Sequence, residues 1–229
     1  MYDFSQARNQ VLQQIQNACD TAHRSDQVDL LAVSKTHSHD AIRAMYALGQ
    51  RAFGENYLQE ACAKIDALQD LEIQWHFIGH VQRNKTKLIA THFAWVHGVD
   101  RLIIAQRLSD QRPEEMPALN ICIQVNIDGQ DSKDGCDPQD VMAMVEKIQH
   151  LPHLHLRGLM VIPAPNNSEA FFQTQKLFRE VATRYPMLKS WDTLSMGMSS
   201  DLLPAVEAGA TLVRVGTALF GSRDYSQDR

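Results

Sequence analysis

The stretch Val28-Asp-Leu-Leu-Ala-Val-Ser-Lys-Thr36 decides how the rest of the chain is interpreted. Five of the six residues from Val28 to Val33 are apolar, and Ser34-Lys35-Thr36 then turns polar. A short apolar run with polar borders is typical of a buried strand in a parallel sheet. Lys35 stands at the carboxyl end of this strand, where proteins with parallel sheets place their chemistry. Taken alone, Lys35 is either a solvated charge or an amine held over a pocket.

Strand-like and helix-like segments alternate along the rest of the chain. Strands are predicted at residues 28–33, 52–54, 74–79, 93–99, 119–127, 154–162, 192–195 and 211–215. Helices are predicted between them at 40–48, 57–68, 84–91, 101–109, 138–149, 169–184 and 202–208, and before the first strand at 4–24. Eight such units without a break in composition predict one domain over residues 1–229. Its fold is expected to be α/β, a closed (β/α)8 TIM barrel with an additional N-terminal helix.

An open, doubly wound sheet is the alternative fold. Such a sheet usually carries the pattern GxGxxG directly after an early strand, where it binds a dinucleotide. The chain has neither this pattern nor the GxxxxGK[ST] pattern of a P-loop. The closed barrel is therefore favoured.

Composition and charge exclude several classes of protein. The chain of 229 residues is 44% hydrophobic and 21% charged, as is usual for a soluble globular protein. Its net charge of −5 disfavours a nucleic-acid-binding surface. No apolar run approaches the roughly 20 residues that span a bilayer, and residues 1–8 lack the apolar core of a secretory signal. We expect a cytoplasmic protein that contacts neither nucleic acid nor membrane.

The cysteines and histidines show no metal-binding pattern. The four cysteines lack CxxC spacing, and none of the ten histidines stands in an HExxH motif. We expect free thiols and no metal site.

Two glycine-containing turns follow the last two predicted strands. Ser195-Met-Gly-Met-Ser-Ser200 leads into a helix, and Gly216-Thr217 follows the eighth strand, where it is expected to open a short helical turn. Backbone N–H groups at helix starts bind phosphate, and barrel enzymes often hold a phosphate at these two loops. The alternative is that Ser199 only caps a helix and Gly216 only permits a turn. Because the two turns occur together, a phosphate site is favoured.

Arg214 interrupts the apolar run of the eighth strand. A buried charge needs a partner or a solvated cavity. Arg214 is expected either to pair with a carboxylate such as Asp192 or Glu207 at the rim, or to face a ligand as a donor to an aromatic nitrogen or an anion. A strand-end lysine, a phosphate site and an arginine together suggest a phosphorylated aldehyde bound as an imine. An imine forms from the neutral amine, which burial and a neighbouring cation both favour.

Six motifs resemble the pyridoxal phosphate homeostasis protein family, over residues from about Val28 to Arg223. They are Ala-Val-Ser-Lys35-Thr, Phe-Gly-Glu-Asn56-Tyr-Leu-Gln-Glu60, Trp75-His-Phe-Ile-Gly-His80 with Gln82 and Asn84-Lys85, Gly158-Leu-Met, Leu194-Ser-Met-Gly-Met-Ser199 and Val213-Arg-Val-Gly-Thr-Ala-Leu-Phe-Gly221. The resemblance implies a barrel similar to the N-terminal domain of alanine racemase, with pyridoxal 5′-phosphate (PLP) as cofactor.

The resemblance also implies roles for six residues. Lys35 would be the Schiff-base lysine, Arg214 would face the pyridine nitrogen and Asn56 would lie beside the ring. The phosphate would be held by Ser199, Gly216 and Thr217. The loop Gly129–Gly135 departs slightly from the family's form, and Ser200 stands where an acidic residue is common; neither change touches these six residues.

Two functions remain open, a PLP carrier without catalytic turnover and an amino-acid racemase. Racemisation needs acid–base groups on both faces of the ring, and Lys35 provides one while no second base is evident. The racemase also places a second domain after its barrel, and this chain ends shortly after its eighth strand. We therefore expect a carrier that takes part in PLP homeostasis, a monomer, with apo forms of PLP-dependent enzymes as candidate partners.

Overall fold

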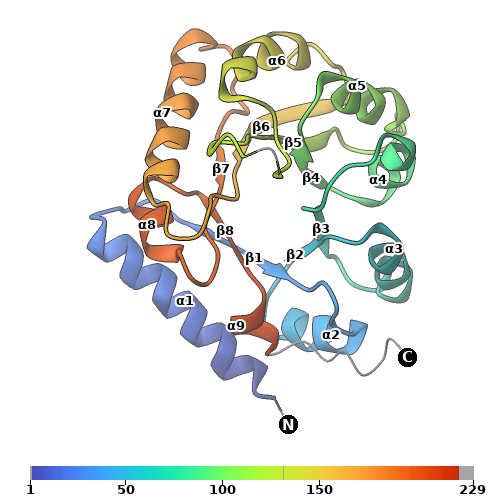
Figure 1. The fold of residues 1–229 in the computed structure, drawn as a ribbon. Coiled ribbons are helices and arrows are strands. Elements are labelled where there is room, and N and C mark those ends of the chain that lie inside the picture. Colours follow the sequence, from blue (N-terminus) through green and yellow to red (C-terminus); the bar gives the residue numbers. More distant parts are fainter. Residues whose placement is uncertain (1, 131, 222–229) are drawn as a thin grey trace.

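The computed structural model describes residues 2–130 and 132–221 (Figure 1). In this part of the chain every strand pairs in parallel with its neighbours in sequence order, and β8 pairs with β1. The sheet is thus a closed barrel, which confirms the predicted fold. Its strands are β1 (Asp29–Val33), β2 (Ala52–Glu55), β3 (Gln74–Phe77), β4 (Trp95–Val99), β5 (Leu119–Gln124), β6 (Leu154–Met160), β7 (Thr193–Ser195) and β8 (Leu212–Val215).

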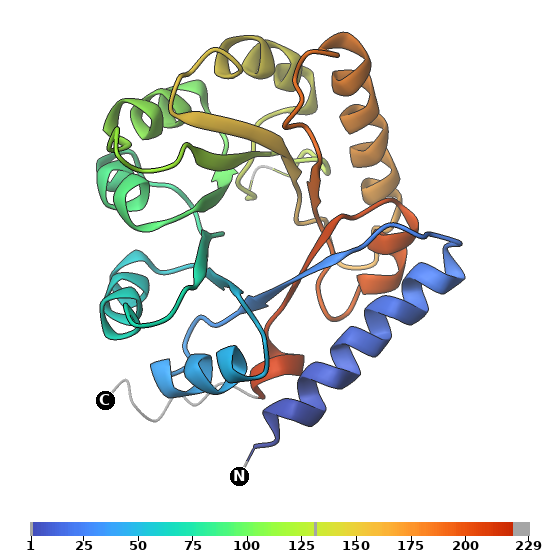
Figure 2. The same ribbon diagram turned by 180° about the vertical axis from the view of Figure 1, so that it is seen from behind.

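A ring of helices surrounds the barrel, as Figures 1 and 2 show from opposite sides. The helices that follow β1 to β7 are α2 (His39–Ala47), α3 (Leu58–Ala67), α4 (Thr86–His92), α5 (Leu102–Gln111), α6 (Val141–Ile148), α7 (Glu169–Arg184) and α8 (Leu202–Glu207). Single 3₁₀ turns, η1 (Arg83–Lys85) and η2 (Pro138–Asp140), precede α4 and α6. The short α9 (Thr217–Phe220) follows β8 and matches the helical turn expected after Gly216.

The apolar residues of the strands form two separate clusters. Most outward-facing strand residues pack against the helices in one continuous core. Trp95, Cys122 and Met160, from three neighbouring strands, form a smaller cluster. This cluster lies inside the barrel, because His97, on the same face of β4 as Trp95, reaches across to Ser195 of β7. The barrel interior is therefore partly polar.

The N-terminal helix α1 (Phe4–Thr21) covers the outside of the barrel beside α8 and α9 (Figures 1 and 2). Asp3 caps it by accepting a hydrogen bond from the N–H of Gln6 at 2.9 Å. Its apolar stripe, with Val11 and Ile15 at its centre, is buried. The predicted additional helix is confirmed, and it ends three residues before the predicted end at residue 24.

The remaining differences from the predicted elements are small. The fifth strand ends at Gln124 instead of residue 127, because the chain then turns back so that the N–H of Asn126 bonds to the carbonyl of Cys136. The predicted helix 84–91 is split into η1 and α4. Two parts of the sequence predictions lie outside the described residues. They are residue 131 in the loop 129–135, and residues 222 and 223 at the end of the family resemblance.

None of the helices in the described part of the chain is both long and apolar enough to cross a membrane.

Candidate functional site

The six predicted site residues lie at or just beyond the carboxyl ends of four strands that are neighbours in the barrel. Lys35 lies two residues beyond β1, and Asn56 directly follows β2. Arg214 lies in β8, Gly216 and Thr217 follow it, and Ser199 comes four residues after β7. Because the order β7-β8-β1-β2 is continuous in the closed sheet, one arc of the barrel rim holds all six.

Backbone contacts connect the neighbouring strand ends of this arc. A Cβ atom built on Gly216 would lie 3.3 Å from the carbonyl oxygen of Val33, near the end of β1. The N–H of Arg214 bonds to the carbonyl of Gly197 at 3.0 Å, and the N–H of Ser34 bonds to that of Gly54 at 3.0 Å. The ends of β8, β1 and β2 and the turn after β7 are thus in direct contact.

Ser199, after β7, and Asn56, after β2, are the outer members of the arc. The side chains of Ser199 and Thr217 are exposed. Ser199 borders a cavity of about 330 Å³ that α1 and α8 also line. The structure therefore brings Lys35, Asn56, Arg214 and Gly216 together and leaves the Ser199 side chain at the edge.

The Arg214 guanidinium is buried inside the barrel, with 5% of the residue exposed. Its Nη1 donates to the carbonyl and the Oγ of Ser195 at 2.6 and 2.8 Å, and Nη2 donates to the carbonyl of Val161 at 2.9 Å. Neither Asp192 nor Glu207 pairs with it; Asp192 binds Arg157 instead, at 2.8 Å. Of the two sequence interpretations, rim pairing is wrong for this reason.

The buried position of Arg214 changes the pKa of its guanidinium. Burial lowers the pKa of the guanidinium to about 10, an effect that the nearby carboxylate of Asp201 opposes. Arg214 remains a cation at neutral pH, held by neutral acceptors. Among the residues that the structure describes, its hydrogen bonds use only the two Nη groups, so the Nε–H is free to donate to a ligand.

The loop that holds Lys35 is supported by a buried polar cluster that the sequence analysis did not identify. The Nζ of Lys64 donates to the carbonyl of Ser34 and to Oε1 of Glu55, both at 2.8 Å, and to Oε1 of Glu60. Ser34 Oγ donates to Glu55 at 2.6 Å, and the N–H of Thr36 donates to Glu60 at 2.6 Å. Both neighbours of the half-buried Lys35 are thus held in place.

The same cluster explains an unusual backbone conformation. Thr36 has a φ of 65°, in the left-handed region that β-branched residues rarely adopt. Its hydrogen bond to Glu60 offsets the cost of this conformation. Burial raises the pKa of the Glu55 carboxyl, while the charge and hydrogen bond of Lys64 lower it.

The side-chain oxygen of Asn56 is a buried acceptor without a hydrogen-bond donor among the described residues. Its Oδ1 is inaccessible to solvent and has no hydrogen-bond partner among the described residues. A buried amide oxygen without a partner costs free energy, so a donor at this position is expected from a ligand. The turn after β3 packs directly against the backbone of Asn56, since a Cβ on Gly79 would lie 2.2 Å from the Asn56 carbonyl oxygen.

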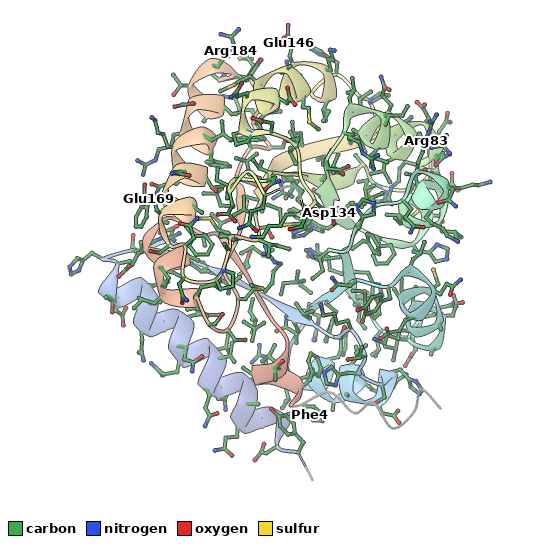
Figure 3. All side chains as sticks on the ribbon, in the orientation of Figure 1. Phe4, Arg83, Asp134, Glu146, Glu169 and Arg184 are labelled. Atoms are coloured by element: carbon green, nitrogen blue, oxygen red, sulfur yellow. The ribbon has the colours of Figure 1, made fainter. Side chains whose placement is uncertain are left out.

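The loop after β5 extends over the barrel mouth, and Asp134 lies near the centre of the ring in Figure 3. Asp134 Oδ1 lies 3.0 Å from Nδ1 of His80, which follows β3. At its base, Asp128 accepts hydrogen bonds from Lys133 at 2.8 Å and from the N–H of Ala164 at 2.6 Å. The loop after β5 is therefore tied to the segments that follow β3 and β6 at the carboxyl end of the barrel.

A cavity of about 620 Å³ lies at the opposite end of the barrel, where the strands begin. Gln74, His76, Trp95 and Arg157 line it, and none of the six predicted site residues does. The loops at this end of a TIM barrel generally serve stability, and those at the carboxyl ends serve function. Among the described residues, no three His, Cys, Asp or Glu side chains gather as a metal site would require.

One signal would have revealed the supporting residues. Glu55 ends a buried strand and His97 lies in the middle of another, as Arg214 does. Applying the argument for a buried charge to polar residues within apolar strands identifies, among others, Glu55, His76, His97 and Ser195. Lys64 had no such signal, because a lysine four residues after Glu60 on a helix is typical of an exposed ion pair.

Comparison with known proteins identifies the family. The model of the alanine racemase N-terminal domain matches residues 8–224. The pyridoxal phosphate homeostasis protein of Pseudomonas aeruginosa is 56% identical over 198 residues, which are 86% of each chain. That of Escherichia coli K12 is 46% identical over 236 residues, covering 99% of this chain and 100% of that protein.

Solved structures agree with the sequence matches. PipY of Synechococcus elongatus PCC7942, solved with PLP bound, has a TM-score of 0.84 and 37% identity, covering 96% of this chain and 100% of that chain. Alanine racemase of Clostridium difficile in complex with cycloserine has a TM-score of 0.68 and 11% identity, covering 93% of this chain and 60% of that one. This second similarity concerns the barrel fold alone. The fold, the near-complete coverage and the identity of these relatives show that the chain belongs to the pyridoxal phosphate homeostasis protein family.

Proposed function

We propose that this protein binds PLP at the carboxyl ends of β7, β8, β1 and β2 and takes part in PLP homeostasis without catalytic turnover. The observation that carries the proposal is the buried Arg214, which has a free Nε–H and lies on the same arc of the rim as Lys35 and Asn56. The relatives' names and the PLP bound to PipY support it.

The residues of the arc fit the cofactor's functional groups. The Lys35 amine would add to the aldehyde carbon and release water, leaving a Schiff base. The Arg214 Nε–H would donate to the pyridine nitrogen. The unpartnered Oδ1 of Asn56 would accept from the ring's phenolic hydroxyl. Each assignment pairs a donor with an acceptor or an amine with an aldehyde.

The phosphate is assigned to Ser199, Gly216 and Thr217. The first N–H groups of a helix have no acceptor within the helix, and Gly216 directly precedes the start of α9. Hydroxyl groups of Ser199 and Thr217 would add donors to the same anion. Because both side chains are exposed, they are available to a ligand at the rim.

Arg214 bears on the choice between carrier and racemase. Bound PLP supplies an electron sink whose strength depends on protonation of its pyridine nitrogen. An arginine that donates to this nitrogen keeps it unprotonated and so weakens the sink. Alanine racemase also uses an arginine, so this residue alone does not decide between carrier and racemase. Racemisation requires an acid–base group on each face of the ring. Lys35 accounts for only one of these two groups. A carrier needs only reversible attachment.

The assembly and partners follow from this proposal. Residues 1–229 would act as one PLP-binding domain and as a monomer, since a carrier needs no second subunit to complete a catalytic site. The candidate partners are apo forms of PLP-dependent enzymes, which would receive the cofactor.

Absorption spectroscopy tests the Schiff base. Purified protein mixed with PLP and then separated from unbound PLP by gel filtration should be yellow, borohydride should bleach the band, and mass spectrometry should then locate the added group on Lys35. Lys35→Ala should abolish the band, while Lys87→Ala, on the exposed side of α4, should retain it. A wild-type protein that is colourless after removal of unbound PLP would refute the proposal.

A racemisation assay tests the absence of turnover. Incubation of the PLP-loaded protein with L-alanine or D-alanine should leave the enantiomer ratio unchanged in polarimetry or chiral chromatography. Sustained racemisation that depends on Lys35 would transfer the assignment to the racemase class.

A further inference from the structure

A row of polar side chains crosses the interior of the barrel from Arg214 to the far end. Ser195 and His97 have no exposed surface, and His76 is 1% exposed. Arg214 Nη1 lies 2.8 Å from Ser195 Oγ, and Ser195 Oγ lies 2.8 Å from His97 Nδ1. His97 Nε2 lies 3.0 Å from His76 Nδ1, and His76 Nε2 lies 3.2 Å from Gln74 Oε1. These hydrogen bonds link β8, β7, β4 and β3 in one chain.

The described partners of Ser195 set the direction of the hydrogen bonds in the chain. A guanidinium only donates, so Ser195 Oγ accepts from Arg214. Among the described partners of Ser195 Oγ, His97 Nδ1 is then the one acceptor for the hydroxyl proton, which places the His97 proton on Nε2. That proton is donated to His76 Nδ1, and the His76 proton, also on Nε2, is donated to Gln74 Oε1. With both rings neutral, the Ser195 hydroxyl and both nitrogens of each histidine ring are satisfied.

The environment keeps the two histidines neutral. Burial lowers the pKa of His76 to about 3, with a smaller contribution from Arg157. Burial also lowers the pKa of His97 well below its ordinary value, helped by His76 and Arg214. A protonated ring here would place a second cation against the buried guanidinium. Neutral rings instead provide an acceptor without adding charge.

Arg214 depends on this chain for its orientation. No carboxylate of the described residues binds it, and its other described acceptors are the carbonyl oxygens of Ser195 and Val161. Ser195 Oγ is the only side-chain acceptor among its described partners. The hydroxyl can turn unless His97 holds its proton, so His97 acts on Arg214 through Ser195.

We propose that Ser195 and His97 are positioning residues that hold the Arg214 guanidinium so that its free Nε–H faces the cofactor's pyridine nitrogen. The assignment of the ring nitrogen rests on the proposed function, whereas the orientation of Arg214 does not. The chain ends at Gln74 and His76, which line the cavity of about 620 Å³ at the amino end of the barrel. Arg214 is thus anchored through the whole depth of the barrel.

Nitrogen-15 NMR of the cofactor-free, histidine-labelled protein tests the orientation alone. His97 and His76, assigned by their loss in His97→Asn and His76→Asn, should both be neutral with the proton on Nε2. Their shifts should not change between pH 5 and 8. A proton on Nδ1 of His97, or titration of either ring in this range, would overturn the proposal without any variant having to bind cofactor.

Variants and PLP labelled with nitrogen-15 in the pyridine ring test the consequence for the cofactor. Wild type should show an unprotonated, hydrogen-bonded ring nitrogen. Ser195→Ala and His97→Leu should move this signal and speed cofactor dissociation about tenfold or more, the value of one hydrogen bond to a charged group. His97→Asn should restore the signal, because its amide oxygen replaces the Nδ1 acceptor.

Two substitutions outside the chain serve as matched controls. Ser190→Ala removes a hydroxyl that binds the Leu156 carbonyl at 2.8 Å, and His155→Gln changes an exposed ring on β6. Both should leave the pyridine signal unchanged. If folded Ser195→Ala and His97→Leu also leave it unchanged, the positioning role is refuted. If the wild type binds no PLP, the proposed function fails, while the histidine measurement still decides the orientation of Arg214.

Discussion

At the scale of single residues, Lys64 has all its donors satisfied in the interior. An ammonium has three N–H donors, and those of Lys64 go to the carbonyl of Ser34 and the carboxylates of Glu55 and Glu60. Glu55 has no exposed side-chain surface and Lys64 has 8%. Without the cation between them, two carboxylates would face each other below the Lys35 loop.

We expect Lys64→Met to destabilise the protein by about 3–5 kcal/mol, since it leaves a buried charge without its partner. Urea unfolding followed by circular dichroism measures this. Lys87→Met, on the exposed face of α4, is the control and should change stability by less than about 0.5 kcal/mol. A similar small change for Lys64→Met would contradict the view that the cluster is a closed ion network.

At the scale of elements, the turn after β3 sets the position of the end of β2. The N–H of Ile78 bonds to the carbonyl of Glu55 at 2.9 Å, and Gly79 then passes so close to Asn56 that no side chain fits between them. This close approach, rather than a special backbone angle, explains the glycine. The turn therefore holds Asn56 against the candidate site.

Gly79→Ala should displace the Asn56 backbone, because its Cβ would lie 2.2 Å from the Asn56 carbonyl oxygen. We expect a loss of about 1–3 kcal/mol in stability together with weaker PLP retention, measured by thermal unfolding and dialysis. Gly129→Asn is the control, because nothing lies within 4 Å of its Cβ position and asparagine tolerates its φ of 63°. Equal behaviour of both variants would refute the packing argument.

At the scale of the whole molecule, the buried histidines make folding sensitive to acid. His76 titrates near its ordinary pKa of 6.5 when unfolded and at about 3 when folded. Below pH 6.5 the unfolded chain therefore binds more protons than the folded one, so the free energy of unfolding falls as the pH falls. His97, whose pKa is also lowered by burial, acts in the same direction.

Between pH 6.5 and 5, His76 alone should reduce the free energy of unfolding by about 2 kcal/mol. Urea unfolding at several pH values measures the slope. His76→Gln should flatten it, whereas His155→Gln, which changes an exposed ring, should follow the wild type. Identical slopes for all three proteins would show that His76 is not buried as a neutral ring.

The sequence by itself determined the order of the strands and helices and hence the barrel. Apolar runs such as Val28–Val33 exclude water from both sides, and a chain of eight such runs separated by amphipathic helices has few other ways to bury them. It also indicated the rim as the place of the candidate site, because parallel strands bring their carboxyl ends together. The roles of Lys35, Asn56, Ser199, Arg214, Gly216 and Thr217 toward PLP stay predictions.

Only the tertiary structure decided which side chains support that rim. Contacts of Arg214 with Ser195, and of Lys64 with Glu55, join strands or helices whose relative position no local pattern encodes. A histidine in an apolar strand or a lysine on a helix is chemically ambiguous until burial determines its charge and its partners. Closure of the barrel places these groups out of reach of water, and the need to satisfy each buried donor and acceptor then selects their arrangement.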